Sequence, residues 1–167
     1  MEIAYRKATK KDAERLLLHL KTVGGETDNL SFGKDTFLIS KEKEERFIDR
    51  FASSKKDLML VALSGDTVVG NAIVERNRVA RYSHRAEISI TVLRDFWGKG
   101  IGTRLMQMMI DFAKESGIEI LYLEARADNA RAISLYEKFG FKSIGTYKGF
   151  FKIENQYFDA VLMTLKL

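Results

Sequence analysis

The residues best suited to chemistry form a glycine-rich turn, GKGIGT, at residues 98–103. The turn follows a run of alternating apolar residues and precedes an amphipathic helical pattern, so it leads from a strand into a helix. Glycine lets the backbone curl around an anion, and the N–H groups and dipole at a helix N-terminus attract negative charge. The spacing predicts a phosphate-binding turn, although two glycines in a G-x-G could also make a tight connection only.

Two motifs at and after this turn resemble those of the GNAT superfamily of N-acetyltransferases. Residues 92–103 resemble its pyrophosphate signature, Q/R-x-x-G-x-G/A, with Gly100 and Gly102 at the glycine positions and Trp97 where Gln or Arg is usual. Residues 123–141 are similar to the family segment L-x-V-x-x-x-N-x-x-A-x-x-L-Y-x-x-x-G-F. Both motifs occur in the family order and spacing, whereas the nucleotide-binding pattern G-x-x-x-x-G-K-S/T is not in the sequence.

The resemblance implies an enzyme that moves an acetyl group from acetyl-CoA to a primary amine by direct attack in a ternary complex. It also implies a V-shaped opening between two parallel central strands, with pantetheine along the backbone of Ile90, Thr91 and Val92. The pyrophosphate would lie on the turn formed by Gly98, Lys99, Gly100, Ile101, Gly102 and Thr103.

Two residues of the second motif have roles that the resemblance implies. The Asn129 side chain would fix the pantetheine arm, and Tyr136 would present its hydroxyl to the thioester sulfur and protonate the departing thiolate. Asn129 also suits a helix N-cap, and Tyr136 could instead be a core aromatic residue with a satisfied hydroxyl.

A base is needed because an amine attacks a thioester only when it is neutral. An amine of pKa ~10.4 is neutral in about one molecule per two thousand at pH 7. Glu124 matches the position of a Glu base in the family's N-terminal-amine acetyltransferases, and Glu87 on the neighbouring strand is the second candidate. Either could act through a water, or could form a surface ion pair with Arg85 or Arg126.

One polar strand face indicates a solvent-filled cleft. Glu87, Ser89 and Thr91 share a face of the run at residues 85–93, whereas a central strand covered by helices should be apolar on both sides. Contacts with the acceptor are expected from the first two helices and the last hairpin, at Glu26, Thr27, Phe32, Tyr147, Tyr157 and Asp159. The two acidic residues among them would suit a cationic amine, unless they are ordinary loop or turn residues.

Hydrophobic periodicity predicts the elements that position these residues. Strands are expected at residues 2–9, 57–63, 67–75, 85–93, 118–125, 141–153 and 157–167, and helices at residues 10–23, 41–54, 101–116 and 129–139. Gly24 and Gly25 are expected to end the first helix. The central strand-helix-strand crossover predicts one parallel strand pair. The fold class is therefore α/β, a GNAT-like three-layer α/β/α sandwich with a mixed, mostly antiparallel sheet, in a single domain of residues 1–167.

Composition limits the remaining choices. With 167 residues, 46% hydrophobic and 31% charged, the chain has the make-up of one globular domain. It lacks cysteine and its apolar runs are short, so we expect a cytoplasmic protein with no metal and no membrane partner. The net charge of +5 could attract acetyl-CoA. The basic residues are mixed with acidic ones, as in KEKEERFIDR at residues 41–50, a pattern typical of a solvated helix face. This mixing disfavours nucleic acid as a partner.

Two other functions compete with catalysis. A non-catalytic acyl-CoA-binding module would typically lack the tyrosine and the cleft carboxylates, and a ribosome- or RNA-associated binding protein would cluster basic and aromatic residues. We therefore expect acetyl-CoA and an amine acceptor as partners. The acceptor stays open between a protein N-terminus, a polyamine and another small amine, and a homodimer stays open as well.

Overall fold

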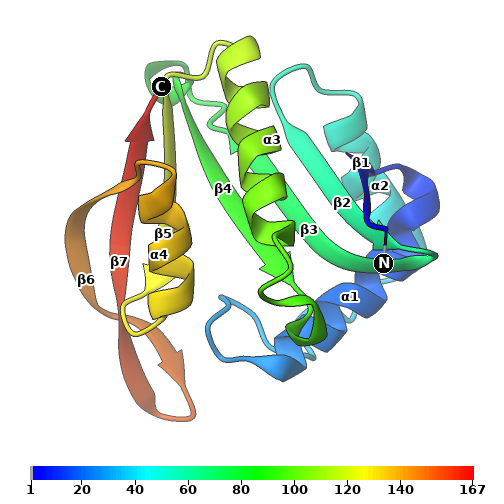
Figure 1. Cartoon of the computed structure of the whole chain (residues 1–167), viewed down its shortest axis with the longest axis horizontal. Helices are drawn as coiled ribbons and strands as arrows, with labels where there is room; N and C mark the ends of the chain where they lie inside the picture. Colours follow the sequence, from blue (N-terminus) through cyan, green and yellow to red (C-terminus); the bar gives the residue numbers. More distant parts are fainter. Residues whose placement is uncertain (1) are drawn as a thin grey trace.

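The computed structural model describes residues 2–167, whose seven strands form one mixed sheet in the order β1-β2-β3-β4-β5-β7-β6 (Figure 1). The strands are β1 (Ala4–Lys7), β2 (Leu58–Ser64), β3 (Thr67–Arg76), β4 (Arg85–Val92), β5 (Ile120–Arg126), β6 (Lys142–Ile153) and β7 (Gln156–Lys166). Neighbouring strands are antiparallel except β4 and β5, which are parallel. The predicted α/β sandwich with one parallel pair among the described strands is confirmed.

Helices cover both faces of this sheet. They are α1 (Ala13–Glu26), α2 (Lys41–Ala52), α3 (Ile101–Glu115) and α4 (Ala130–Lys138). Leu60 of β2 belongs to the core under α3, and its neighbour Val61 belongs to the core under α1 and α2. Successive strand residues point to opposite faces, so the two cores lie on opposite sides of the sheet. Within residues 2–167, no helix is both long enough and apolar enough to span a membrane.

The first helix ends later in the sequence than predicted. The glycines at 24 and 25 are expected to end it, but α1 continues through them to Glu26. A Cβ atom on Gly24 would lie 2.6 Å from the carbonyl carbon of Gly33, so glycine is required here for close packing of the following loop. The predicted helix end is therefore wrong, and the loop after α1 is held close to the helix.

Strands β4 and β5 pair only over their first halves (Figure 1). The parallel ladder joins Arg85 to Ile120 and ends where Glu87 meets Tyr122. Beyond it, β4 stays paired with β3 as far as Val92, while β5 stays paired with β7 to its end. The sheet therefore separates into two arms, and a wedge-shaped opening lies between them at the ends of β4 and β5.

Candidate active site

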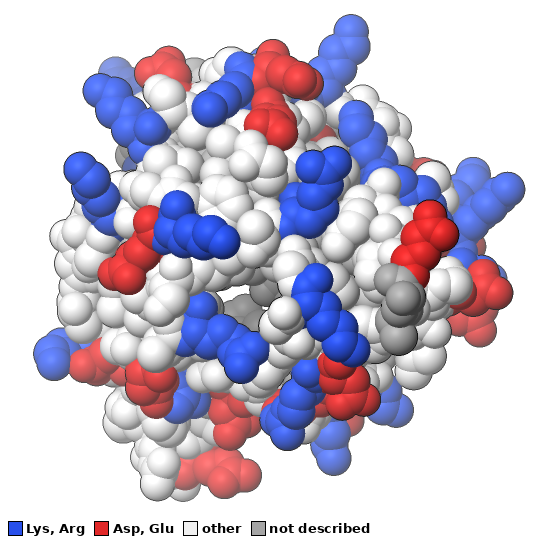
Figure 2. Space-filling model, viewed as in Figure 1, with Lys and Arg blue, Asp and Glu red and all other residues white. Residues whose placement is uncertain are grey.

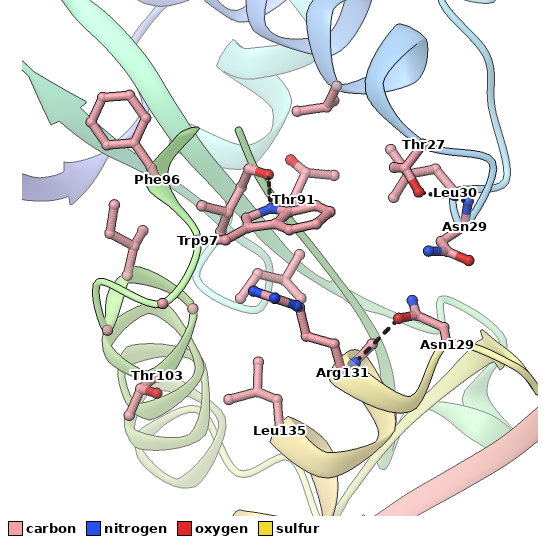
Figure 3. Close-up of a pocket in the computed structure, with 18 residues that line it drawn as sticks. Thr27, Asn29, Leu30, Thr91, Phe96, Trp97, Thr103, Asn129, Arg131 and Leu135 are labelled. Carbon is pink, nitrogen blue, oxygen red and sulfur yellow. Dashed lines mark hydrogen bonds between the residues drawn. The ribbon is translucent and has the colours of Figure 1, made fainter. Parts of the chain in front are cut away.

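A cavity of about 410 Å³ lies at this opening, between the end of β4, the start of α3 and the first turns of α4 (Figure 3). We call it the donor cavity. The residues that the sequence analysis assigns to donor binding and that line it are Ile90, Thr91, Val92, Gly98, Gly100, Ile101, Gly102, Thr103 and Asn129. Lys99 is not among them, because its side chain lies on the surface with its ammonium 4.7 Å from the centre of the Phe96 ring.

The glycine turn has the backbone geometry of an anion site. Gly98 and Gly100 have φ angles of 73° and 78°, in the left-handed region that disfavours a side chain. Gly100 is the N-cap of α3, and its carbonyl accepts the first helical hydrogen bond from the N–H of Arg104. The amides of the first helical turn have no carbonyl one turn before them, and they lie at the positive end of the helix dipole. This end of the donor cavity is therefore suited to phosphate oxygens.

The edge of β4 offers backbone hydrogen-bonding groups to the opening. The N–H of Leu93 donates to the carbonyl of Val69 on β3, so the backbone groups of Val92 and Ile90 point the other way, toward the opening. The indole N–H of Trp97 donates to the carbonyl of Val92 at 2.8 Å (Figure 3). The backbone of Ile90 and the N–H of Val92 therefore face the opening, where an extended ligand with amide groups could bind to them.

Arg131 brings a positive charge that the sequence analysis did not assign. Its guanidinium lies 4.6 Å from the centre of the Trp97 ring and lines the donor cavity (Figure 3). Figure 2 shows further Lys and Arg side chains around the hollow on this face. The signature that residues 92–103 resemble has Gln or Arg at the position of Trp97, and in this chain the Arg131 guanidinium on α4 lies over the Trp97 ring. The sequence offered one indication of this role: Arg131 follows Asn129, a predicted donor-site residue, by two positions.

A second cavity, of about 520 Å³, continues from the donor cavity toward α1, α2 and the β6–β7 hairpin. We call it the acceptor cavity. All three predicted catalytic residues line it: Glu87, Glu124 and Tyr136. Asn129 and Thr91 line both cavities, so the two cavities meet beside the point where β4 and β5 separate.

Glu124 lies close enough to Glu87 to influence its protonation. Partial burial and the neighbouring carboxylates of Glu124 and Glu75 raise the pKa of Glu87 above its usual range. Two like charges across the opening favour retention of a proton on one of them, which makes Glu87 a stronger proton acceptor than an ordinary surface carboxylate.

The arginines expected to neutralise these carboxylates have other partners. Arg126 forms an ion pair with Asp128, with 2.6 Å between Nη2 and Oδ2, and the guanidinium of Arg85 lies over the rings of Tyr82 and Tyr122. Across residues 2–167, neither Glu87 nor Glu124 takes part in an ion pair. The surface ion pair that the sequence left open is therefore not formed.

Tyr136 lies on α4 with its ring buried against Phe141, 5.8 Å between ring centres. Asn129 caps the same helix by accepting the N–H of Ala132 at 3.3 Å, and the seven-residue spacing places Asn129 and Tyr136 on one helix face. Burial raises the pKa of Tyr136 to about 12, so its hydroxyl keeps its proton at neutral pH. The residue can therefore donate a hydrogen bond from its protonated hydroxyl to a group in the acceptor cavity.

The two acidic residues expected to contact the acceptor have structural partners instead. Glu26 Oε2 accepts the backbone N–H of Arg94 at 2.9 Å, which ties the end of α1 to the segment before the glycine turn. Asp159 accepts a backbone N–H and pairs with a lysine inside the β6–β7 hairpin. Of the other candidates, Thr27 lines the donor cavity and Phe32 lines the acceptor cavity. Tyr147 and Tyr157 lie exposed on the surface of the hairpin.

His19 is a buried polar residue that the sequence analysis did not select. It is 2% exposed, with Nδ1 3.0 Å from the carbonyl oxygen of Val68 and Nε2 2.8 Å from Oγ1 of Thr91. A carbonyl can only accept, so we assign the proton to Nδ1 and let Nε2 accept from the hydroxyl. The ring therefore joins α1 to two strands and fixes Thr91 at the meeting point of the cavities. Only the folded chain brings these groups together.

We expect the protein to lose stability as the pH falls from about 6.5 to about 4. Burial lowers the pKa of His19 from 6.5 to about 4, so within this range the unfolded chain takes up a proton that the folded protein does not. The full effect is about 3 kcal/mol. Urea titrations across this range, with wild type and His19→Gln, measure it. An equal fall in the free energy of unfolding of both proteins would contradict the assignment.

Comparisons with known proteins indicate a family for the chain. A family model described as "Acetyltransferase (GNAT) family" matches residues 28–141. A crystal structure of a GNAT-family acetyltransferase from Streptococcus pneumoniae superposes with a TM-score of 0.95 at 30% sequence identity, covering 99% of both chains.

Relatives with assigned activities act on different amines. The chain is 35% identical over 79 residues to the ribosomal protein bS18-alanine N-acetyltransferase of Salmonella typhimurium, which is 47% of this chain and 53% of that protein. It is 28% identical over 130 residues to the L-amino acid N-acetyltransferase AaaT of Escherichia coli, covering 77% and 80% of the two chains. The chain thus spans about half the length of the ribosomal-protein acetyltransferase that it matches.

Proposed function

The chain belongs to the GNAT acetyltransferase family, and we propose that it transfers an acetyl group from acetyl-CoA to a primary amine by direct attack in a ternary complex. The observation that carries this proposal is the meeting of two cavities where β4 and β5 separate. Direct transfer requires both substrates to be bound at once, one from each side. The donor cavity and the acceptor cavity supply these two approaches.

Residues of the donor cavity suit the parts of acetyl-CoA. The left-handed glycines, the first-turn amides of α3 and the Arg131 guanidinium would hold the pyrophosphate. The backbone of Ile90 and the N–H of Val92 would bind the amides of pantetheine, as a neighbouring strand would, with the Asn129 side chain nearby. When bound, acetyl-CoA supplies an activated acyl group on a thiol leaving group.

Three side chains of the acceptor cavity would move the protons. The amine nitrogen forms a bond to the thioester carbonyl carbon, and the carbon–sulfur bond breaks. Glu87 or Glu124 would accept the proton that the amine must lose, directly or through a water, and Tyr136 would give its proton to the departing thiolate. The groups are assigned these roles because they line one cavity next to the end of the donor cavity.

The competing functions have less support. A module that only binds acyl-CoA has no need of a buried tyrosine and two carboxylates in the cavity next to the donor cavity. A ribosome- or RNA-associated binding role would not explain why a cavity of this kind continues through the opening between β4 and β5. The relatives that modify a ribosomal protein or amino acids both act on primary amines, so the proposed reaction class includes both kinds of acceptor.

A panel of primary amines tests the proposal directly. With acetyl-CoA present, at least one amine should give free CoA and the matching N-acetyl product in equal amounts, measured by thiol detection and mass spectrometry. Calorimetry of acetyl-CoA alone serves as the control for donor binding. Tight donor binding without product from any primary amine would favour the binding module.

Replacing the base should lower kcat/KM more at neutral pH than at high pH. If Glu87 or Glu124 accepts the amine proton, the Gln variant should lose about 10²-fold or more in kcat/KM at neutral pH, and less at high pH where more amine is already neutral. Profiles of Glu87→Gln and Glu124→Gln, compared with Glu119→Gln outside the cavities, measure this. A loss that does not vary with pH in both variants would remove both residues from the proton path.

A further inference from the structure

A buried carboxylate stands on the apolar face of α2. Glu44 shares this face with Ile48 and Phe51, at a spacing of four and seven residues, where an apolar side chain is expected. Glu44 is 3% exposed overall, its carboxylate has neither an ion pair nor a hydrogen bond to another described residue, and its oxygens keep some contact with solvent. Burial accordingly raises its pKa. A carboxylate that has lost most of its solvent and has no protein partner costs stability, and a cationic ligand in the cavity would offset this cost.

Glu44 lines the α2 side of the acceptor cavity. The wall of this cavity is largely apolar, with Leu16, Leu20, Phe32, Phe37, Phe47 and Ile73 among its residues. Glu87 and Glu124 line the same cavity from β4 and β5. The cavity thus has one carboxylate on α2 and two on the central strands, within a largely apolar wall.

We propose that Glu44 binds a second cationic group of the acceptor, so that the acceptor is a diamine or longer polyamine with an apolar methylene spacer. The inference rests on the proposed acetyl transfer: one amine, neutral, would lie at Glu87 and Glu124, and the other would stay an ammonium ion at Glu44. The ammonium supplies the partner that the buried carboxylate lacks, and the methylene groups match the apolar wall.

The same charges disfavour other small amines. An amino acid would bring its own carboxylate into a cavity that already holds Glu44, Glu87 and Glu124, and like charges at close range repel. A simple alkylamine would leave Glu44 buried without a partner. The cavity therefore selects for positive charge at both ends of the acceptor.

A paired series of amines tests the inference. We expect each α,ω-diaminoalkane of suitable length to exceed the n-alkylamine of the same length by about 10-fold or more in kcat/KM, as a hydrogen bond to a charged group contributes. Glu44→Gln should bring the diamine down to the level of the monoamine. Glu45→Gln, with the same charge change at the next residue and outside both cavities, should keep the diamine advantage. A diamine advantage that survives Glu44→Gln would overturn the inference.

Calorimetry with the diamine alone separates this inference from the proposed reaction. Wild type and Glu45→Gln should bind the diamine about 10-fold or more tightly than Glu44→Gln does. Binding that depends on Glu44, without CoA release from any amine, would support the inference and overturn the proposed transfer. Acetylation of monoamines and diamines alike, with diamine affinity unchanged in Glu44→Gln, would overturn the inference and leave the transfer intact. Thermal unfolding should show Glu44→Gln at least as stable as wild type at pH 7, because a buried charge has been removed.

Discussion

Replacing Tyr136 with Phe should lower kcat by about 10²–10⁴-fold while acetyl-CoA still binds. The change removes one oxygen and keeps the ring that packs against Phe141. If Tyr136 protonates the departing thiolate, the loss falls on the chemical step. Steady-state CoA release gives kcat, and calorimetry with acetyl-CoA gives the affinity.

A matched tyrosine controls for the loss of a hydroxyl group. Tyr5 lies on β1, partly buried and outside both cavities, so Tyr5→Phe should keep its turnover. Near-normal turnover of Tyr136→Phe would show that water protonates the thiolate, since a thiol of pKa ~8.5 is a good leaving group. Tyr136 would then be a core residue whose loss changes stability only.

Replacing Gly100 with Val should abolish the binding of acetyl-CoA. Gly100 has a φ angle of 78°, which a β-branched residue adopts only under strain. A Cβ atom there would meet no protein atom within 4 Å among the described residues, and it would enter the space assigned to the pyrophosphate. The side chain therefore disturbs the turn and occupies the anion site. Calorimetry with acetyl-CoA measures the loss.

Gly117 offers a control with the same backbone strain elsewhere. It has a φ angle of 71° just after α3, at the other end of that helix from the glycine turn, and lines neither cavity. Gly117→Val should lower the thermal unfolding temperature to a similar extent as Gly100→Val but keep the affinity for acetyl-CoA. Equal affinity in wild type and Gly100→Val would mean that the pyrophosphate lies elsewhere.

The periodic parts of the fold could be predicted from the sequence because they depend on neighbouring residues. Alternation along residues 85–93 placed Glu87 on a different face from Ile88, and both assignments agree with the strand that forms. The glycine turn was recognised because left-handed backbone at Gly98 and Gly100 leaves a direct mark on the sequence. Local rules therefore predicted the strand, the glycine turn and the helix that follows it.

Features that depend on distant contacts could not be predicted in the same way. Gly24 resembles a helix end, but its role is set by Gly33, which packs against it. Arg131 is held by a ring 34 positions earlier in the chain, Trp97. Glu44 lies in an acid-rich helical segment that predicts a solvated face, and only the position of α2 on the sheet buries it. These three cases share one cause, because each depends on packing between separate elements.

The position of Trp97 makes the donor cavity visible to spectroscopy. The chain contains one tryptophan, and it lines this cavity, with its indole N–H bonded to Val92 and the Arg131 guanidinium over its ring. Indole fluorescence depends on the polarity and charge of its surroundings. All tryptophan emission of the unlabelled protein therefore originates at the donor cavity, and a change in its intensity or wavelength reports events at that cavity in wild type and in every variant that keeps Trp97.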